Sequence, residues 1–152
     1  MIELLWKSSQ IEGNTYDLLD TEQLLKYNIE APDHSKEEAQ VLLNHKAAIE
    51  YTATYVAIFQ ELSVGKIIDI HTFLTKSMGI SKTIRERMVR ITGTGYTPPD
   101  NRFLIEEGLK KLCIAVNANS NQYKKALLTV LLISYLQPFE DGNNHRNTQL
   151  PL

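Results

Sequence analysis

The chain has 152 residues, of which 43% are apolar and 22% are charged, the composition of one ordinary globular domain. Its formal net charge is -2 and its basic residues are scattered, which argues against a nucleic-acid or a membrane partner. The sole cysteine, Cys113, excludes an intrachain disulfide and is expected in the core, and no apolar run reaches membrane-spanning length. We therefore expect a cytoplasmic protein, because the first residues do not read as a secretory signal.

Apolar residues recur at helical spacing through the first half of the chain. They predict helices at 2–12, 16–27, about 36–59 and 67–77. Ser35, followed three residues later by Glu38, forms the pattern of a capping box at the start of the third helix. The apolar surface of that helix is wide, which predicts a central helix with neighbours on two sides.

The stretch 88–100 interrupts the helical pattern. Its Thr- and Gly-rich centre predicts a short β-hairpin or extended flap, which two consecutive prolines end. Two more helices follow, at about 102–117 and at 122–136, and the second is the most apolar in the chain. The predicted fold class is therefore all-α, a helical bundle with one short β-hairpin flap.

The loop after the last helix, residues 137–146, combines a carboxylate, a Gly-Asn-Asn turn and a basic residue. If a helix begins after Gly142, its free N–H groups form an anion site. Asp141 could hold a divalent metal against that anion, and Arg146 could contact phosphates. On spacing alone an ordinary Asp-Gly-Asn surface turn explains the same residues, so this cradle needs independent support.

Three segments in order along the chain give that support through a family resemblance. Residues 138–143, Pro-Phe-Glu-Asp-Gly-Asn, resemble the core of the Fic (filamentation induced by cAMP) motif, His-Pro-Phe-x-Asp-Gly-Asn-Gly-Arg. Residues 8–14 resemble the family's inhibitory motif, Ser/Thr-x-x-x-Glu-Gly/Asn, and residues 90–100 resemble its target-binding flap. The resemblance implies a single Fic-like domain over 1–152, with an inhibitory helix at 1–14, a flap at 88–100 and the motif at 137–146.

The resemblance also implies an adenylyltransferase, which moves AMP from ATP, with Mg²⁺, to a hydroxyl side chain of a target protein. Asp141 would hold the magnesium ion, and the nucleotide would be bound by Gly142, Asn143, Asn144 and Arg146. The inhibitory residues would be Ser8, Glu12 and Gly13, with Glu12 displacing the γ-phosphate from a motif arginine. The target flap would comprise Thr92, Gly93, Thr94, Gly95 and Tyr96.

The chain departs from the family pattern at the catalytic residues. Gln137 stands where the family has its general-base histidine, and an uncharged amide cannot take a proton near pH 7. Asn144 replaces a glycine, and the first motif arginine aligns either with His145 or, after one inserted residue, with Arg146. The second arginine is missing in both alignments, so Glu12 lacks its usual partner. We therefore expect a degenerate motif end, a truncated chain, through a frameshift or otherwise, and weak or absent adenylyl transfer.

Two other interpretations stay open. The chain could be a catalytically inactive protein-interaction module, which uses the flap to add a partner's strand and the exposed face of the helix at 122–136 to pair two copies. It could also be a related transferase that uses another nucleotide or phospho-donor. A rise in melting temperature with ATP and magnesium would favour a nucleotide site over the module.

Overall fold

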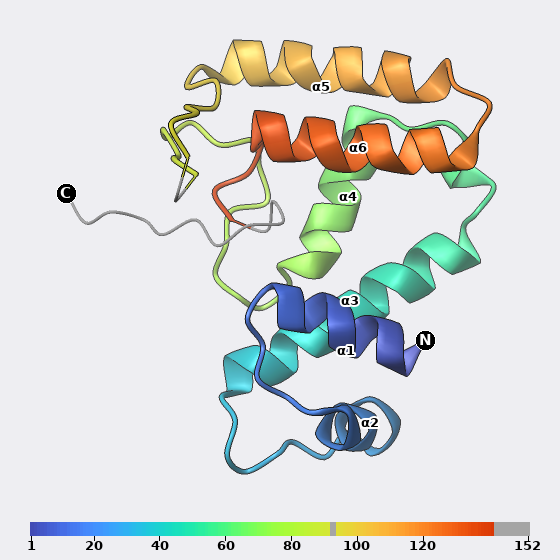
Figure 1. Cartoon of the computed structure of the whole chain (residues 1–152), viewed down its shortest axis with the longest axis vertical. Helices are drawn as coiled ribbons and strands as arrows, with labels where there is room; N and C mark the ends of the chain where they lie inside the picture. The colour runs from blue at the N-terminus through green and yellow to red at the C-terminus, as the bar shows by residue number, and fades with distance from the viewer. Residues whose placement is uncertain (92–93, 142–152) are drawn as a thin grey trace.

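The computed structural model describes residues 1–91 and 94–141, and this part of the chain forms six α-helices and one 3₁₀ helix. Their bounds are α1 (Ile2–Ile11), α2 (Leu18–Tyr27), α3 (Lys36–Thr54), η1 (Ile58–Gln60), α4 (Val64–Leu74), α5 (Arg102–Asn117) and α6 (Gln122–Leu136). In Figure 1, α1, α2 and α3 make the lower part of the molecule, and α4, α5 and α6 make the upper part. The all-helical prediction is confirmed for the described residues.

The N-terminal group of helices is built around one apolar cluster. Leu5 of α1, Leu24 of α2 and Leu42 of α3 are buried and belong to it. Burial of each leucine contributes about 2 kcal/mol. Because each of the three helices supplies one of these side chains, α1 is an integral part of this core.

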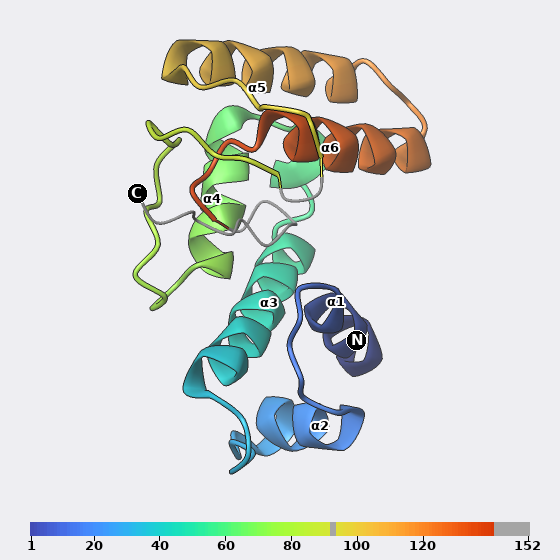
Figure 2. The ribbon, with the colours of Figure 1, turned by 60° about the vertical axis from the view of Figure 1, so that its left-hand side comes forward.

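A second apolar cluster joins α4, α5 and α6. It includes Ile67, Leu109 and Leu136, one from each helix. Helices α5 and α6 lie side by side in Figures 1 and 2. Gly108 permits this close approach, because a Cβ atom there would lie 2.5 Å from Cδ2 of Leu136. Phe139 extends the same cluster past the end of α6, so the first residues of the following loop are anchored in the core.

Asn44 joins the two groups of helices. It is buried on α3, and its Nδ2 donates to the carbonyl oxygens of Leu74 at 3.0 Å and Lys76 at 2.8 Å. These carbonyls lie at the C-terminal end of α4, where helical partners run out. Gln40 completes the arrangement by donating to Oδ1 of Asn44 at 2.8 Å. The end of α4 is therefore fixed against the side of α3.

Several sequence predictions are confirmed at the level of single residues. Ser35 Oγ accepts from the Glu38 N–H and the Glu38 carboxylate accepts from the Ser35 N–H, which is the expected capping box. The helices expected at 102–117 and 122–136 have those bounds. None of the described helices combines the length and the apolar character that crossing a membrane requires.

Four predicted helices have different bounds in the structure, and those expected at 2–12 and 16–27 differ by only one or two residues at one end. The helix expected at 36–59 ends at Thr54, and a short 3₁₀ helix follows it. The helix expected at 67–77 begins at Val64, because Ser63 Oγ accepts from the backbone N–H of Lys66 and so starts the helix earlier.

The β-hairpin expected at 88–100 is absent from the described residues of that stretch, 88–91 and 94–100, in which no strand is assigned. The N–H of Thr94 donates to the carbonyl of Ile91 at 3.3 Å, which is a turn contact and not a strand ladder. Contacts with neighbouring helices and loops hold this stretch instead.

Candidate functional site

The site begins where α6 ends. Gln137 closes the helix in the left-handed region, with φ 45° and ψ 60°, and its N–H donates to the carbonyl of Ile133 at 2.8 Å. Its side chain is fully buried and Nε2 donates to the carbonyl of Ser134 at 2.8 Å. Its Oε1 is buried and has no hydrogen-bond partner among the described residues. The side chain is thus turned back onto the helix end, and its amide has no basicity to offer a substrate.

His71 of α4 holds the loop that follows Gln137. Its Nε2 donates to the carbonyl of Asp141 at 2.9 Å, and its ring stacks on Phe139 with centroids 3.7 Å apart and planes 8° apart. A carbonyl oxygen only accepts, so the proton sits on Nε2. Burial lowers the pKa of His71, which keeps the imidazole neutral. The hydrogen bond and the ring stacking of His71 therefore hold Asp141 and Phe139 against α4.

Arg85 ties the same loop to the flap stretch. It is 1% exposed, and its backbone N–H donates to the carbonyl of Pro138 at 2.9 Å. Its guanidinium donates to four carbonyl oxygens, those of Gln137 at 2.5 Å, Pro99 at 2.6 Å, Arg87 at 2.8 Å and Leu136 at 3.3 Å. Burial lowers the pKa of this guanidinium, which nevertheless keeps its charge.

The flap stretch also packs on the end of α6. The Tyr96 ring stacks on Tyr135 with centroids 4.7 Å apart, and its hydroxyl donates to the Tyr135 carbonyl at 3.1 Å. Burial and the nearby Tyr135 side chain raise the pKa of Tyr96. Pro98 is buried beside them. Figure 2 shows the yellow-green stretch passing next to the red end of α6.

The segment expected to be inhibitory, residues 1–14, contacts α3 at its end. Glu12 is the C-cap of α1, and its Oε2 lies 3.6 Å from Nε2 of His45, an ion pair when the imidazole is protonated. Gly13 has φ 86°, a left-handed conformation that glycine adopts without strain. Ser8 is half-buried on α1. His45 follows Asn44 in α3, and Asn44 is the residue that binds the end of α4. Glu12 therefore contacts the same turn of α3.

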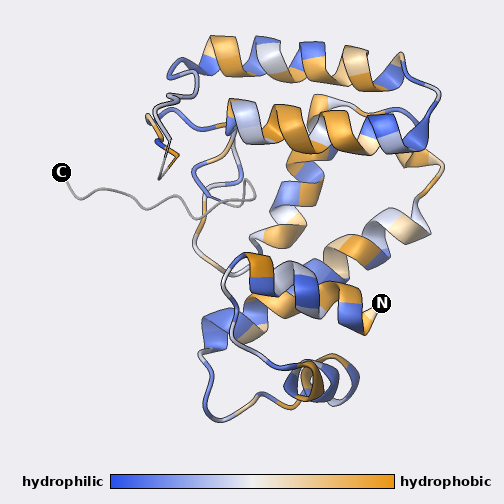
Figure 3. Ribbon diagram, viewed as in Figure 1, coloured by the Kyte–Doolittle hydropathy of each residue, from blue (hydrophilic) through white to orange (hydrophobic). Residues whose placement is uncertain are grey.

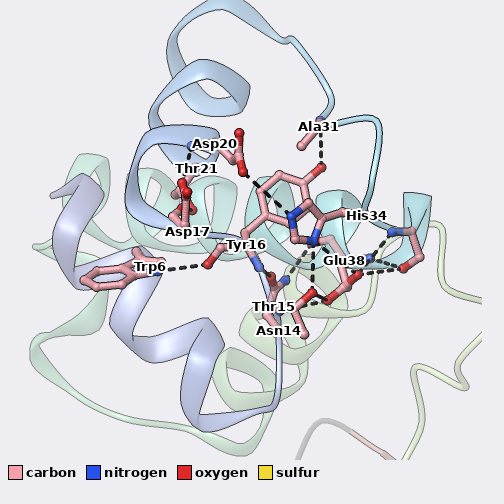
Figure 4. Close-up of polar contacts among 11 residues, drawn as sticks. Trp6, Asn14, Thr15, Tyr16, Asp17, Asp20, Thr21, Ala31, His34 and Glu38 are labelled. Carbon is pink, nitrogen blue, oxygen red and sulfur yellow. Dashed lines mark hydrogen bonds and ion pairs between the residues drawn. The ribbon is translucent and has the colours of Figure 1, made fainter.

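Glu38 anchors this segment from α3. Its carboxylate accepts from the N–H of Thr15 at 2.8 Å, from Thr15 Oγ1 at 2.7 Å and from the Ser35 N–H at 3.1 Å. Figure 4 shows these bonds converging on Glu38 beside Tyr16 and His34. The hydrogen bonds from Thr15 and Ser35 lower the pKa of Glu38 from 4.5 to about 2. A charged Glu38 therefore fixes the turn after Glu12.

The expected site residues divide into those that the structure describes and those that it does not. The described ones, with the flap tip exposed and Gln137 buried, are Ser8, Glu12, Gly13, Thr94, Gly95, Tyr96, Gln137 and Asp141. Outside the described residues lie Thr92, Gly93, Gly142, Asn143, Asn144 and Arg146, together with His145. Arg85 links Gln137 to the flap stretch at Pro99, and Tyr96 contacts Tyr135 of α6. Glu12 contacts His45 of α3.

A magnesium site was expected at Asp141. Among the described residues no group of three or more His, Cys, Asp or Glu side chains could hold a metal ion. Asp141 is an exposed residue with a carboxylate, the hard oxygen ligand that magnesium prefers. Asp141 therefore fits a magnesium ion whose ligands are one protein carboxylate and the phosphates of a bound nucleotide. It does not fit a metal ion bound by protein side chains alone.

Within the described residues the fold is all-helical, and the loop after α6 is anchored by His71 of α4 and by Arg85. A model of the Fic/DOC family matches residues 61–145, more than half of the chain, and the chain belongs to this family. It is similar to Fic-1 (residues 134–508) from C. elegans, with 21% identity and a TM-score of 0.79 over 94% of this chain and 44% of that one.

Two bacterial structures share the fold. A Fic domain containing signaling protein from Bacteroides thetaiotaomicron has 20% identity and a TM-score of 0.75, over 94% of this chain and 57% of that one. A Fic family protein from Desulfovibrio desulfuricans has 18% identity and a TM-score of 0.77, over 94% and 43%. The chain thus spans about half the length of these solved chains.

Sequence reasoning missed Arg85 and the role of Glu38 in the turn after α1. Arg85 precedes the flap by three residues and carries no spacing signal, because it acts on backbone carbonyls of distant segments. The sequence predicts Glu38 only as a capping residue. Its bonds to Thr15 join residues 23 positions apart, and helical periodicity gives no sign of such a contact.

Proposed function

We propose that this chain is a Fic domain of the adenylyltransferase type that binds ATP with Mg²⁺ at residues 141–146 and transfers AMP slowly or not at all. In this proposal 1–152 is one domain, with an inhibitory helix at 1–14 and a flap at 88–100. The observation that carries it is the joining of the motif loop to α4 through His71 and to the flap stretch through Arg85.

The contacts that join these segments come from two buried residues. His71 holds the carbonyl of Asp141 at 2.9 Å, and Arg85 joins the carbonyls of Gln137 and Pro99. The start of the motif therefore has a fixed geometry beside the stretch that would receive a target segment. Fixed geometry at the reacting centre is the main source of rate in phosphoryl-type transfer.

In this proposal the metal has one protein ligand among the described residues. Asp141 would hold Mg²⁺ through its carboxylate, and the bound metal would neutralise the phosphate charge. Gly142, Asn143 and Asn144 would supply N–H groups to the phosphates, with Arg146 as a charged contact. Thr92 to Tyr96 would align the hydroxyl side chain of the target protein.

The transfer step is where this chain is weakest. Removal of a proton from the target hydroxyl needs a base, and Gln137 has none to offer. Its Nε2 already donates to the carbonyl of Ser134 at 2.8 Å, so the side chain is engaged in ending α6. Loss of a general base costs about 10² to 10⁴ in rate, which leaves binding intact and chemistry slow.

Self-inhibition through Glu12 is part of the same proposal. The 3.6 Å approach of Glu12 to His45 supports it, because His45 offers a partner to the inhibitory carboxylate when the imidazole is protonated. Ser8 and Gly13 would set the end of the inhibitory helix. The Gly13 turn and the Glu38 bonds to Thr15 keep the carboxylate near α3.

Thermal shift with Mg-ATP tests the nucleotide site. At ten times the dissociation constant, binding stabilises the fold by about 1.4 kcal/mol, or a rise of about 3–6 °C. We expect Asp141→Asn to lose the magnesium-dependent part of the rise and the exposed Asp33→Asn, a matched control, to keep it. Absence of any rise in the unmodified chain at millimolar Mg-ATP contradicts the proposal.

Labelling with α-³²P-ATP tests the transfer step separately. The unmodified chain should label itself and a protein extract only weakly, and Gln137→His should label more strongly if binding is intact. Strong labelling by the unmodified chain contradicts the role given to Gln137. Transfer from another nucleotide in the same assay would indicate a different donor.

The exposed face of α6 favours a second candidate, an interaction module that pairs two copies of the chain. Figure 3 shows apolar colour along much of α6. Its exposed apolar residues lie at helical spacing and are Tyr123, Leu127, Val130, Leu131 and Tyr135. Under this candidate Leu127→Glu abolishes pairing in analytical ultracentrifugation and leaves the helical circular dichroism signal unchanged. A monomer at all concentrations contradicts it.

A further inference from the structure

We propose that Arg85 is a positioning residue that fixes the flap stretch 94–100 and the motif loop 137–141 relative to each other. The inference rests on the proposed function for what these two segments do. The link between the two segments rests on the contacts of Arg85 alone.

The contacts of Arg85 reach both segments at once. Nε donates to the carbonyl of Gln137 at 2.5 Å and Nη2 donates to the carbonyl of Pro99 at 2.6 Å. The backbone N–H of Arg85 donates to Pro138 at 2.9 Å. One residue therefore sets the separation between the base of the flap and the first residues of the motif.

The acceptors explain why a charged group occupies this position. The carbonyls of Leu136 and Gln137 lie at the C-terminal end of α6, where helical donors are missing and the helix dipole is negative. A buried cation at that end is stabilised by the dipole and by charge-assisted hydrogen bonds. Every acceptor that the described residues give the guanidinium is a backbone carbonyl, so the contacts do not depend on the side chains of the loops.

The geometry of the guanidinium makes arginine hard to replace. Its planar fork presents donors in three directions, which here point to α6, to Pro99 and to Arg87. Lysine has one ammonium group at the end of a stem and cannot reach carbonyls on opposite sides at the same time. Preserving the charge is therefore not enough to preserve the link.

Tyr96 provides an internal comparison. It holds the flap stretch to α6 through Tyr135, and its hydrogen bond and ring stacking within the described part of the chain both go to Tyr135 and not to 137–141. Removal of its hydroxyl should loosen 94–100 without changing 137–141. Removal of the Arg85 guanidinium should loosen both segments together, because the same group binds both.

Hydrogen exchange by mass spectrometry on the full chain, without nucleotide, tests this link. In Arg85→Lys and Arg85→Met we expect the amides of 94–100 and of 137–141 to exchange at least about tenfold faster, relative to the slowest amides of α5, because several charge-assisted hydrogen bonds are lost. Tyr96→Phe should change only the first of these segments. The exposed Arg102→Met, which loses its bonds to Glu86 and Glu106, should change neither.

Exchange at wild-type rates in Arg85→Lys overturns the proposal, as does faster exchange in only one of the two segments. A uniform rise across α4, α5 and α6 also overturns it, because that pattern indicates a general loss of stability. If the Met variant does not fold, the Lys variant decides. The result does not depend on ATP, so a chain that fails to bind Mg-ATP removes the proposed function and leaves this test standing.

Discussion

Glu38→Gln tests how the turn after α1 is held. The carboxylate accepts from Thr15 through one oxygen and from Ser35 through the other. Glutamine offers only one acceptor oxygen, so its NH₂ group must face the N–H of either Thr15 or Ser35. Glutamine also serves in a capping box, which means that the Thr15 bonds bear the loss.

The magnitude follows from the pKa of Glu38, which falls from 4.5 to about 2 on folding. At 1.36 kcal/mol per pKa unit that displacement corresponds to about 3 kcal/mol. Solvent screening at this partly exposed carboxylate reduces the contribution, and we expect about 1.5 kcal/mol at pH 7. For a chain of this length the melting temperature should fall by about 3–6 °C.

The pH dependence gives this prediction its direction. The folded pKa is depressed, so the stabilisation is complete above pH 4.5 and is lost as the pH falls toward 2. In urea titrations the stability gap between the wild-type chain and Glu38→Gln should shrink by about half between pH 5 and pH 3.

The control for this experiment is Glu37→Gln, an exposed neighbour in the same first turn of α3. It loses the same charge near the helix dipole without losing the bonds to Thr15. A gap that stays constant over this pH range, or an equal loss in both variants, would refute the reasoning.

Three shorter predictions concern the fold around the site. Asn44→Ala should lose about 2–3 kcal/mol in chemical denaturation, because the carbonyls of Leu74 and Lys76 lose their donor, and equal stability would contradict this. His71→Gln should be about 1–2 kcal/mol less stable at pH 7.5. The difference in stability between the wild-type chain and His71→Gln should narrow at pH 5.5. Burial lowers the pKa of His71, so the wild-type chain becomes less stable as the pH drops below 6.5. A constant difference would count against a neutral His71. Gly108→Val should lose about 2 kcal/mol through overpacking against Leu136, whereas Gly65→Val, in an open position, should lose less.

Local signals in the sequence were sufficient for the last two helices. Asn101 and Asn121 cap α5 and α6 through their own side chains, and a cap lies next to the residues that it governs. The end of α3 was predicted wrongly because Tyr55 and Phe59 continue the apolar spacing. In the structure both rings pack on Tyr51, which needs no continuous helix.

The flap illustrates a different limit. Thr and Gly are typical of hairpins, but no strand pairing holds the described residues of this stretch. It is held by hydrogen bonds with Arg85 and Tyr135 and by its own buried Pro98. Contiguous motifs such as 138–143 can be recognised along the chain. A residue that binds backbone carbonyls far away in sequence leaves no pattern, because its partners can be of any type.

The burial of Leu5 restricts how the proposed inhibition could be relieved. Helix α1 cannot detach as a separate arm, since Leu5 is completely enclosed and Trp6 donates to the Tyr16 carbonyl at 2.9 Å. Its departure would open the whole N-terminal core. Activation would instead have to work through side-chain rotation of Glu12 or a small change at the Gly13 turn, so an activator need only supply the energy of one local rearrangement.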